Sequence, residues 1–410
     1  MRLRHGAPLW LTRPSSRRHR RYPTYKGALD VDVAIVGGGI TGAVAAYLFS
    51  EAGVRVALVE ARECGRGSTA ASTALLMQEP DKDFSDLTAR YGAKTARRIW
   101  RALMAGARDL TRTIRKLKID CDLQSCDSIY FTLQPDKLPG LRKEFRDRKR
   151  AGLPGRWLSP ARLHELTGIK GRGAILTPGN AEADPLKACT GFLRAAEARG
   201  AKIFERSRVS RITTSNGRVT LKTQNGAILA NQVVIATGYA TIEFKPLAGR
   251  FRLMNTYVIA TRRLPDKLRR KLLHDRTMLW DTDRPYHYLR WTEDNRLIIG
   301  GEDSRHRSTR GARKRLTAGS SRLRRYQAAV YPDLGPEQPE YAWEGLFAET
   351  PDGLPYIGPH RRYPKHLFAL GYGGNGMTVS FLAAQLLLKR YQNRPHPDEE
   401  LFSFGRSRKH

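Results

Sequence analysis

The sequence is poor in cysteine and contains no long hydrophobic run. Four cysteines in 410 residues, at positions 64, 121, 126 and 189, are too few and too scattered for a disulfide framework. Cys121 and Cys126 have no partnering Cys or His pair at metal-ligand spacing, so we expect no metal site. No apolar stretch approaches the roughly 18 residues of a membrane span, and the N-terminal arginines precede no apolar signal core. These absences predict a reduced, cytoplasmic protein without a membrane span.

Acidic residues are scarce relative to basic ones. The chain has 39 Asp and Glu residues against 73 Lys and Arg residues, which is a formal net charge of +34. Such a charge attracts polyanions, including nucleic acid and anionic lipid. The basic residues are nevertheless spread through the whole chain, with no single arm carrying the excess. We therefore favour a generally basic surface over a dedicated nucleic-acid site, and a nucleic-acid partner stays open.

One glycine-rich stretch has the spacing of a nucleotide-binding turn. Residues 31–36 are a β-branched apolar run typical of a buried parallel strand, and Gly37, Gly39 and Gly42 follow in GxGxxG spacing. A helical pattern, a second apolar run and Glu60 complete a βαβ unit. The three glycines make the tight turn, admit a pyrophosphate and let helix and strand pack, while the acid accepts ribose hydroxyls. The stretch predicts an adenine-dinucleotide site.

The rest of the chain predicts two kinds of architecture. Residues 1–29 are a basic lead-in with isolated apolar anchors, which we expect to lie as an extended strap on the body. Residues 251–299 are strand-like and aromatic, which predicts an antiparallel sheet in a second domain. No second GxGxxG occurs in a βαβ context, so we expect no NAD(P)H site. Helices are expected over 84–117, 139–150, 160–166, 184–199, 310–331 and 379–391, and further strands over 122–133, 201–204, 209–213, 219–223 and 227–238.

Five ordered blocks of sequence resemble one flavoprotein family. The blocks DVAIVGGGITG with LVE, GRGSTAAST, VVIATG, TPDGLPYIGP and LFALGYGGNGMT resemble the D-amino-acid-oxidase-like (DAO) family of FAD-dependent oxidoreductases, over roughly residues 30–392. The chain looks most similar to glycine, sarcosine and γ-glutamylputrescine oxidases. The resemblance implies an α/β fold, with a Rossmann-like FAD-binding domain and a discontinuous α+β substrate domain built on an antiparallel sheet. We expect the FAD-binding domain to comprise 30–80, 178–243 and 344–395, the substrate domain 81–177 and 244–343, and a basic tail 396–410.

The resemblance also implies FAD as cofactor. The cysteine that attaches flavin covalently in some relatives has no counterpart near Gly345, so non-covalent FAD is expected. Its adenine would lie beside Val209, its ribose at Glu60 and its isoalloxazine against 68–74 and 371–378, where helix-opening amides can face an anionic flavin. The expected cofactor-binding residues are Gly37, Gly39, Ile40, Thr41, Gly42, Glu60, Ala61, Arg62, Gly67, Ser68, Thr69, Ser72, Thr73, Ala74, Val209, Ala236, Thr237, Gly238, Asp352, Gly371, Tyr372, Gly373, Gly374, Asn375, Gly376, Met377 and Thr378.

The sequence departs from this family at three anchoring positions. Phe347 stands where many members have an arginine for the substrate carboxylate. Thr378 stands where sarcosine-oxidase-like members have a lysine, and Ile298 is nearest to the lysine that promotes their reaction with oxygen. The departures leave open both a small α-amino acid as substrate and oxygen as electron acceptor.

Substrate contacts are expected from the sheet of the second domain. Strand alternation puts Tyr286, Tyr288 and Arg290 on one face and His287 on the other, so we expect His287 to be structural. Together with Tyr257, the first three are the candidates for catalytic, substrate-side residues. An aromatic pair with an arginine above a flavin suits an amine or a distal carboxylate.

These patterns predict an FAD-dependent amine or amino-acid oxidoreductase. It would oxidise a C–N bond by hydride transfer to flavin N5, giving an imine that hydrolyses. The first alternative is a flavin-dependent enzyme that modifies a tRNA base and uses the basic surface to hold RNA. The second is a non-catalytic flavin-binding protein.

Overall fold

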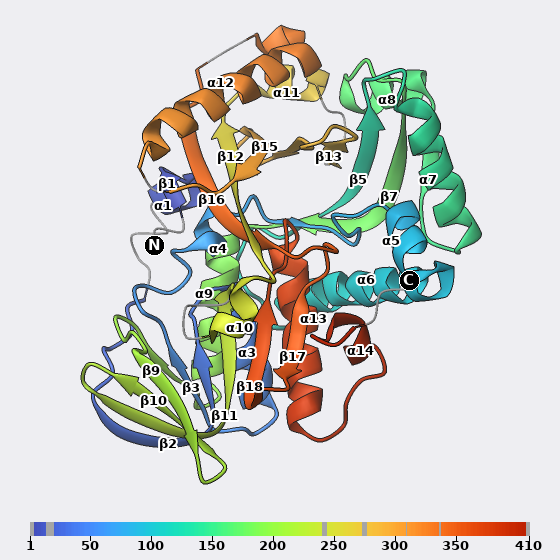
Figure 1. Ribbon diagram of the computed structural model, residues 1–410. Helices are drawn as coiled ribbons and strands as arrows, with labels where there is room; N and C mark the ends of the chain where they lie inside the picture. Colours follow the sequence, from blue (N-terminus) through green and yellow to red (C-terminus); the bar gives the residue numbers. More distant parts are fainter. Residues whose placement is uncertain are drawn as a thin grey trace.

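Two β-sheets, one above the other in Figure 1, organise the chain. The structure is a computed structural model and describes residues 4–13, 20–239, 244–272, 277–308, 310–335 and 338–406. The lower sheet, called sheet I, is built around parallel strands, and the upper one, called sheet II, is mainly antiparallel. Short apolar runs followed by helices account for the first sheet, because parallel strands need helical crossovers between them.

Sheet I contains the predicted nucleotide-binding unit near its centre. In strand order it comprises β17 (Tyr356–His360), β18 (Tyr363–Leu370), β11 (Gly226–Gly238), β2 (Gly27–Val36), β3 (Val56–Val59) and β8 (Lys202–Phe204), with β10 (Arg218–Thr223) and β9 (Arg211–Ser215) added beyond β11. From β18 to β8 the strands run parallel, and β17 is antiparallel to β18. The expected βαβ unit is therefore present, with β2 starting four residues before the predicted run.

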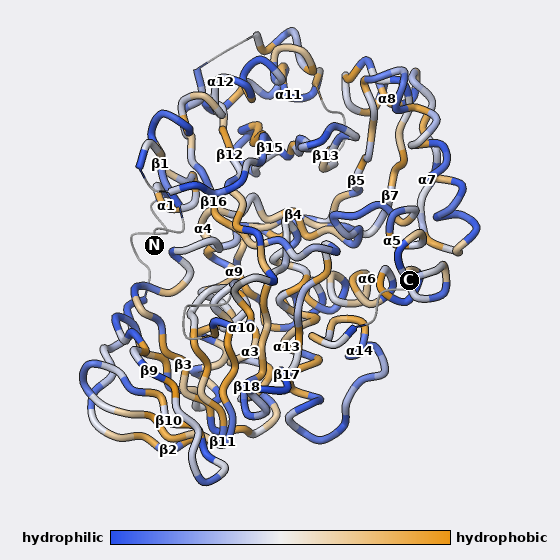
Figure 2. Tube along the Cα trace, viewed as in Figure 1, coloured by the Kyte–Doolittle hydropathy of each residue, from blue (hydrophilic) through white to orange (hydrophobic). Residues whose placement is uncertain are grey.

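Long helices bury the side chains of sheet I. One face packs against α3 (Ile40–Glu51), α6 (Ala93–Lys116), α9 (Pro185–Glu197) and α13 (Gly376–Tyr391). Val33 and Ile35 point to these helices, whereas Ala34 joins the core on the opposite face, as the alternation of a strand requires. Asp184 caps α9, because its Oδ1 accepts from the amides of Leu186 at 2.9 Å and Lys187 at 3.1 Å. Figure 2 shows the apolar residues concentrated along these strands and helices.

Sheet II runs across the top of the molecule. Its strand order is β1 (Arg4–Gly6), β16 (Tyr341–Glu349), β12 (Arg252–Ala260), β15 (Leu297–Arg305), β14 (Tyr288–Trp291), β13 (Thr277–Asp281), β5 (Gln124–Thr132), β7 (Gly173–Glu182) and β4 (Leu75–Leu76), with β6 (Arg156–Leu158) beside β7. Every pairing among these is antiparallel except that of β13 with β5, which is parallel. The antiparallel sheet predicted for residues 251–299 is confirmed, since β12, β15, β14 and β13 pair antiparallel in that order. The parallel pair joins β13 to β5, which is far away in sequence, so no hairpin sets their relative direction.

Shorter helices and turns complete the fold around the two sheets. The remaining elements are α1 (Leu9–Thr12), α4 (Ser68–Ala71), α5 (Phe84–Tyr91), α7 (Leu138–Arg150), α8 (Pro160–Thr167), α10 (Lys245–Ala248), α11 (Asp266–Leu272), α12 (Ala312–Val330), the 3₁₀ turn η2 (Pro332–Leu334) and α14 (Glu399–Phe402). Leucines of α8, α11 and α12 join a core with side chains of sheet II. In the part of the chain that the structure describes, no helix is both long and apolar enough to cross a bilayer.

The helix expected over 84–117 is interrupted. It divides into α5 and α6 at Gly92, whose φ of 79° lies in the left-handed region that ends helices. The hydrophobic spacing continues across the break, so periodicity alone did not reveal it. The N-terminal lead-in does lie on the body, since Leu9, Trp10, Tyr22 and Tyr25 are all buried, and its β1 extends sheet II. The domain boundaries stay a prediction.

Candidate functional site

A large cavity lies between the two sheets, at the carboxyl ends of the parallel strands of sheet I. Its volume is about 1230 Å³, above the range of about 300–1,000 Å³ that drug-sized ligands occupy. The lining comes from the turn after β2, the end of β3, α4, the segment before β9, the end of β11, β16 and the turn before α13. Ligands of open α/β sheets bind at this edge. The cavity is therefore the candidate site.

The glycine turn after β2 is shaped for a close-lying ligand. Gly37 has a φ of 110°, and a Cβ on it would lie 2.6 Å from the carbonyl oxygen of Ala236. A Cβ on Gly42 would lie 1.9 Å from the carbonyl oxygen of Gly37. Gly42 does not line the cavity. It lets α3 approach the turn, which is the packing role predicted for the third glycine.

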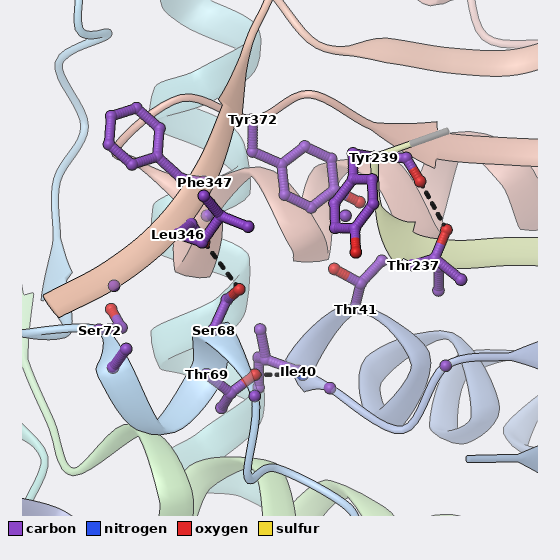
Figure 3. Close-up of a pocket in the computed structure, with 18 of the residues that line it drawn as sticks. Ile40, Thr41, Ser68, Thr69, Ser72, Thr237, Tyr239, Leu346, Phe347 and Tyr372 are labelled. Atoms are coloured by element: carbon purple, nitrogen blue, oxygen red, sulfur yellow. Dashed lines mark hydrogen bonds between the residues drawn. The ribbon is translucent and has the colours of Figure 1, made fainter. Parts of the chain in front are cut away.

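The N-terminus of α3 faces the cavity. Its N-cap is Gly39, which offers no side-chain cap, and both Gly39 and Thr41 line the cavity. The amide of Ile40 donates to Thr69 Oγ1 at 3.0 Å, which links α3 to α4 (Figure 3). A helix N-terminus with exposed amides and a positive dipole end suits a phosphate group. The turn therefore fits the pyrophosphate of FAD.

Glu60 lies at the end of β3 beside this turn. Its Oε2 accepts from the amide of Gly38 at 2.8 Å and its Oε1 accepts from the amide of Arg62 at 2.8 Å. Each carboxylate oxygen can accept a second hydrogen bond, so the group can still receive ribose hydroxyls. Ala61 and Arg62 line the cavity next to it.

We expect Glu60→Ala to weaken FAD binding by about tenfold to a hundredfold, because hydrogen bonds to a charged group contribute about 1.5–3 kcal/mol. The FAD dissociation constant would be measured by flavin fluorescence during titration of the apoprotein. Glu51→Ala is the matched control, since Glu51 ends α3 away from the cavity lining. An unchanged dissociation constant for Glu60→Ala would contradict the ribose assignment.

The Ser- and Thr-rich loop joins the two sheets. Ser68 Oγ donates to the carbonyl of Leu346 in β16 at 2.9 Å, as Figure 3 shows, and Ser72 Oγ accepts from the amide of Ala74 at 3.0 Å. Ser68, Thr69 and Ser72 line the cavity while they make or accept these protein hydrogen bonds. These residues therefore hold the cavity wall together, in addition to the cofactor contacts that the sequence predicts for them.

Most of the expected cofactor-binding residues surround the same cavity. The lining includes Gly37, Gly39, Ile40, Thr41, Glu60, Ala61, Arg62, Gly67, Ser68, Thr69, Ser72, Thr73, Val209, Ala236, Thr237, Gly238, Tyr372, Gly373, Gly374, Asn375, Gly376 and Met377. The last six come from the turn that opens α13, whose N-cap Asn375 makes no side-chain cap. This second helix N-terminus therefore also faces the cavity, as the sequence predicts.

Four further expected cofactor residues lie behind the cavity wall. Ala74 accepts a hydrogen bond from Arg290 through its carbonyl, and Thr378 Oγ1 donates to the carbonyl of Met77 at 3.0 Å. Gly371 packs against Phe251, where its φ of 75° shapes the turn. These residues support the wall from behind.

Asp352 is the fourth residue behind the wall, and its placement corrects the sequence prediction. Its carboxylate accepts from Arg406 Nε at 2.6 Å and Nη2 at 2.7 Å, and both side chains are buried. Burial opposes ionisation of Asp352, but the Arg406 guanidinium outweighs it and holds the pKa of this carboxyl below its usual range. The buried ion pair attaches the C-terminal segment to the turn after β16, so Asp352 is not presented to a ligand.

Only two of the four substrate-side candidates line the cavity. Tyr286 and Tyr288 do, with ring centroids 6.0 Å apart. Tyr257 instead packs beneath α12, where a Cβ on Gly319 would lie 2.4 Å from its ring. This placement corrects the prediction for Tyr257, because the alternation of β12 turns its side chain to the face covered by α12.

Arg290 also lies away from the cavity lining. Its Nε pairs with Glu182 at 3.1 Å, and its Nη1 donates to the carbonyls of Thr73 at 2.8 Å and Ala183 at 2.9 Å. Since the guanidinium is buried and these acceptors occupy it, Arg290 holds the loop after α4 in place. The residue expected to contact substrate is a structural one in this arrangement.

His287 occupies the opposite face of sheet II, as strand alternation predicts. Its Nδ1 lies 2.9 Å from Asp281 Oδ2, its Nε2 lies 3.3 Å from Glu302 Oε1, and its ring stacks on Tyr326. Burial lowers the pKa of His287, but the hydrogen bond and charge of Asp281 and the charge of Glu302 raise it overall. The ring is held by protein groups on both sides.

Among the lining residues that the sequence reasoning missed, three lie close to the two tyrosines. Asp81, Trp280 and Asp303 line the far end of the cavity beside Tyr286 and Tyr288. Burial is the main cause that raises the pKa of Asp81 to about 6 and that of Asp303 to about 7. Asp81 lies in the segment before α5, and Trp280 and Asp303 lie within β13 and β15. Such positions are too common to be singled out, so the sequence carried no signal for these residues.

Comparisons with known proteins agree with this geometry. A family model described as "FAD dependent oxidoreductase" (DAO) matches residues 32–390. The chain is 27% identical to γ-glutamylputrescine oxidoreductase of Escherichia coli (strain K12) over 91% of this chain and 86% of that protein. It is 24% identical to a glycine oxidase of Bacillus licheniformis over 92% and 97% of the two chains. The crystal structure of glycine oxidase from Geobacillus kaustophilus shares the fold with a TM-score of 0.77 at 24% identity, covering 92% of this chain and 99% of that one.

Proposed function

Because this chain belongs to the FAD-dependent oxidoreductase (DAO) family, we propose that it oxidises a C–N bond of an amine or an amino-acid derivative. Membership confirms the resemblance that the five sequence blocks carry, and with it the α/β fold and FAD as cofactor. The observation that carries the proposal is the cavity itself. At sheet I it is lined by the glycine turn and two helix N-termini, which suit a dinucleotide. The same cavity continues to a part lined by sheet II, where a second small molecule can lie.

Different parts of the chain would hold the two molecules. The turn of Gly37 and Gly39 with the N-terminus of α3 would hold the pyrophosphate, and Glu60 the ribose. The turn from Tyr372 to Met377 would lie against the isoalloxazine, with the N-terminus of α13 offering amides to negative charge. Bound FAD supplies the acceptor for a hydride from the carbon next to nitrogen. The chain's contribution is position and electrostatics, and the resulting imine hydrolyses with one water.

The relatives of this chain support the proposal, since they include a γ-glutamylputrescine oxidoreductase and several glycine oxidases. At 24–27% identity these proteins do not specify the substrate of this chain. Phe347 lines the cavity at the position where the sequence comparison expects an arginine for a substrate carboxylate. The acceptor of the electrons, oxygen or another compound, is left open by the proposal.

The proposal predicts that an amine reduces the bound flavin without oxygen. The FAD-loaded protein would be mixed anaerobically with amines, N-methyl amino acids and γ-glutamylated polyamines, and the visible absorbance of oxidised flavin would be followed. We expect at least one of these compounds to remove the absorbance of oxidised flavin after mixing. Dithionite is the control that shows the flavin to be reducible. Bleaching by none of them, together with salt-dependent retention of tRNA, would favour the RNA-modifying alternative instead.

A further inference from the structure

The basic residues of the cavity lie around one segment. Arg206 donates its amide to the carbonyl of Arg62 at 2.7 Å, and Arg4 Nε donates to the carbonyl of Arg66 at 2.9 Å. Burial raises the pKa of Tyr239, and the charges of Arg208 and Arg62 oppose this rise, so both arginines lie near that side chain. Arg62 and Arg66 belong to residues 60–66, and the other three arginines lie beside this segment, next to the glycine turn. This basic end suits the phosphates and ribose of the dinucleotide.

The opposite end of the cavity is acidic and aromatic. Asp81 and Asp303 lie there with Trp280, Tyr286 and Tyr288. The ring centroids of Trp280 and Tyr286 are 6.4 Å apart, and those of Tyr286 and Tyr288 are 6.0 Å apart. Among the described residues, neither Asp81 nor Asp303 has a basic side chain within ion-pair distance. We call these five residues the acidic chamber.

One carboxylate oxygen of the acidic chamber is left without a hydrogen-bond partner. Asp303 Oδ1 is buried and accepts no hydrogen bond from the residues that the structure describes. Asp81 has more hydrogen-bond donors. Its Oδ2 accepts from the amide of Gly374 at 2.6 Å, and the side chain of Tyr286 also hydrogen-bonds to its carboxylate. Thr256 hydrogen-bonds to the Asp303 carboxylate but leaves Oδ1 without a donor. A buried carboxylate oxygen without a compensating donor or cation is unfavourable, so Oδ1 marks a place where a ligand group belongs.

Electrostatics indicate which charge that group carries. Burial raises the pKa of both acids, the charge of Glu349 raises both pKa values further, and repulsion by Asp81 adds to the rise for Asp303. The groups that influence Asp303 are Thr256, Glu349, Asp81 and, from the opposite face of sheet II, His287. The groups that influence Asp81 are the Gly374 amide, Glu349, Lys82 and Tyr286. A cation placed between the two carboxylates would relieve this repulsion, whereas a carboxylate would increase it.

We propose that the acidic chamber binds the substrate as an organic ammonium ion with no carboxylate on the carbon next to nitrogen. The inference rests on the proposed function, because it takes this chamber as the place of the oxidised amine. Asp303 and Asp81 supply the countercharge, and the faces of Trp280, Tyr286 and Tyr288 attract the cation through their π-systems. Phe347 supplies an apolar side wall to the same cavity. Simple alkylamines, arylalkylamines and diamines fit this description, and α-amino acids do not.

The first test compares molecules that differ only by the carboxylate. Putrescine is paired with ornithine, and 2-phenylethylamine with phenylalanine, in anaerobic reduction of the bound flavin. In each pair that reacts, we expect the amine to reduce the flavin at least tenfold faster than the corresponding amino acid does. A faster reaction with the amino acids overturns the inference while it supports the proposed function.

The second test needs no reaction, so it holds even if the proposed function fails. Benzyltrimethylammonium and benzoate share an aromatic ring and carry opposite charges. Neither can be oxidised to an imine, because the nitrogen of the cation is quaternary and benzoate has no nitrogen. Their dissociation constants would be measured on the FAD-loaded protein from the perturbation of the flavin spectrum. We expect the cation to bind at least tenfold more tightly than benzoate. Tighter binding of benzoate, or no binding of the cation, overturns the inference.

Variants locate the binding in the acidic chamber. Asp303→Asn keeps the shape and removes the charge, so the dissociation constant of benzyltrimethylammonium is expected to rise about tenfold to a hundredfold. Asp81→Asn is a second variant with the same expected direction. Asp136→Asn, the same change at an exposed position outside the cavity, is the control. FAD content and thermal denaturation check that each variant is folded. An unchanged affinity in both chamber variants overturns the assignment.

The pH dependence supplies a readout that a structural role would not move. Benzyltrimethylammonium does not titrate, so its affinity reports the protein alone. A protonated acid does not attract a cation, and the pKa values are about 7 for Asp303 and about 6 for Asp81. Affinity is therefore expected to fall as the pH is lowered from about 8 to about 5. Asp303→Asn is expected to lose the upper part of this profile, and a flat profile in the native protein contradicts the proposal.

Discussion

Gly42→Ala is expected to leave the protein unable to hold FAD. The added Cβ would lie 1.9 Å from the carbonyl oxygen of Gly37 and 3.1 Å from its carbonyl carbon, and neither backbone atom can rotate away. To accept the methyl group, α3 must move away from the turn that follows β2. Both the amides at the helix N-terminus and the position of Gly37 would then be displaced from the phosphate site. Overpacking of this kind costs about 3 kcal/mol at the upper end of its range, so stability should fall as well.

The measurements for Gly42→Ala are FAD content after purification, the FAD dissociation constant of the apoprotein and the apparent Tm. Gly140→Ala is the matched control, because Gly140 also lies in a helix, α7, and a Cβ there meets no atom within 4 Å. That control should be neutral or slightly stabilising, since alanine favours helices over glycine by about 1 kcal/mol. A yellow Gly42→Ala protein with native affinity and Tm would show that α3 packs differently from the arrangement described.

Arg290→Ala is expected to destabilise the protein by about 3–5 kcal/mol, since removing one partner of a buried ion pair leaves the other charge uncompensated. The partner left behind is Glu182, which is itself buried. The carbonyls of Thr73 and Ala183 would lose their donor at the same time, and they belong to the segments that hold the loop after α4. FAD affinity should therefore fall together with the apparent Tm.

This result separates the structural role from the substrate role that the sequence suggested for Arg290. A substrate anchor would change KM and leave the Tm and FAD affinity near their native values. Arg305→Ala serves as the control, because Arg305 is exposed at the end of β15. Native stability in Arg290→Ala, with a raised KM alone, would restore the original prediction for this residue.

Local features of the site were predictable because each depends on neighbouring residues. The turn of Gly37, Gly39 and Gly42 follows from the conformations that glycine permits and from the strand and helix that flank it. Glu60 was predictable from its place at the end of the second strand. The N-cap of α9 at Asp184 was predictable from a side chain that bonds amides two and three residues later.

The face of a strand was predictable, but what covers that face was not. Alternation correctly separated Tyr286 and Tyr288 from His287. It also put Arg290 on the face of the two tyrosines, where Glu182 of β7 and the loop after α4 enclose its guanidinium. Tyr257 is covered by α12, which follows β12 much later in the chain. Both side chains were taken for ligand contacts because their partners come from distant segments.

The sequence by itself determined the family, the cofactor and the glycine turn beside the cavity, since these depend on short-range spacing. Only the tertiary structure decided the chemistry of the far end of the cavity. Asp81 comes from the segment before α5, Trp280 from β13 and Asp303 from β15, and the strand order of sheet II brings them together. Their proximity depends on which strands pair, and their raised pKa values depend on burial, so neither property can be assigned until the two sheets have closed over the cavity.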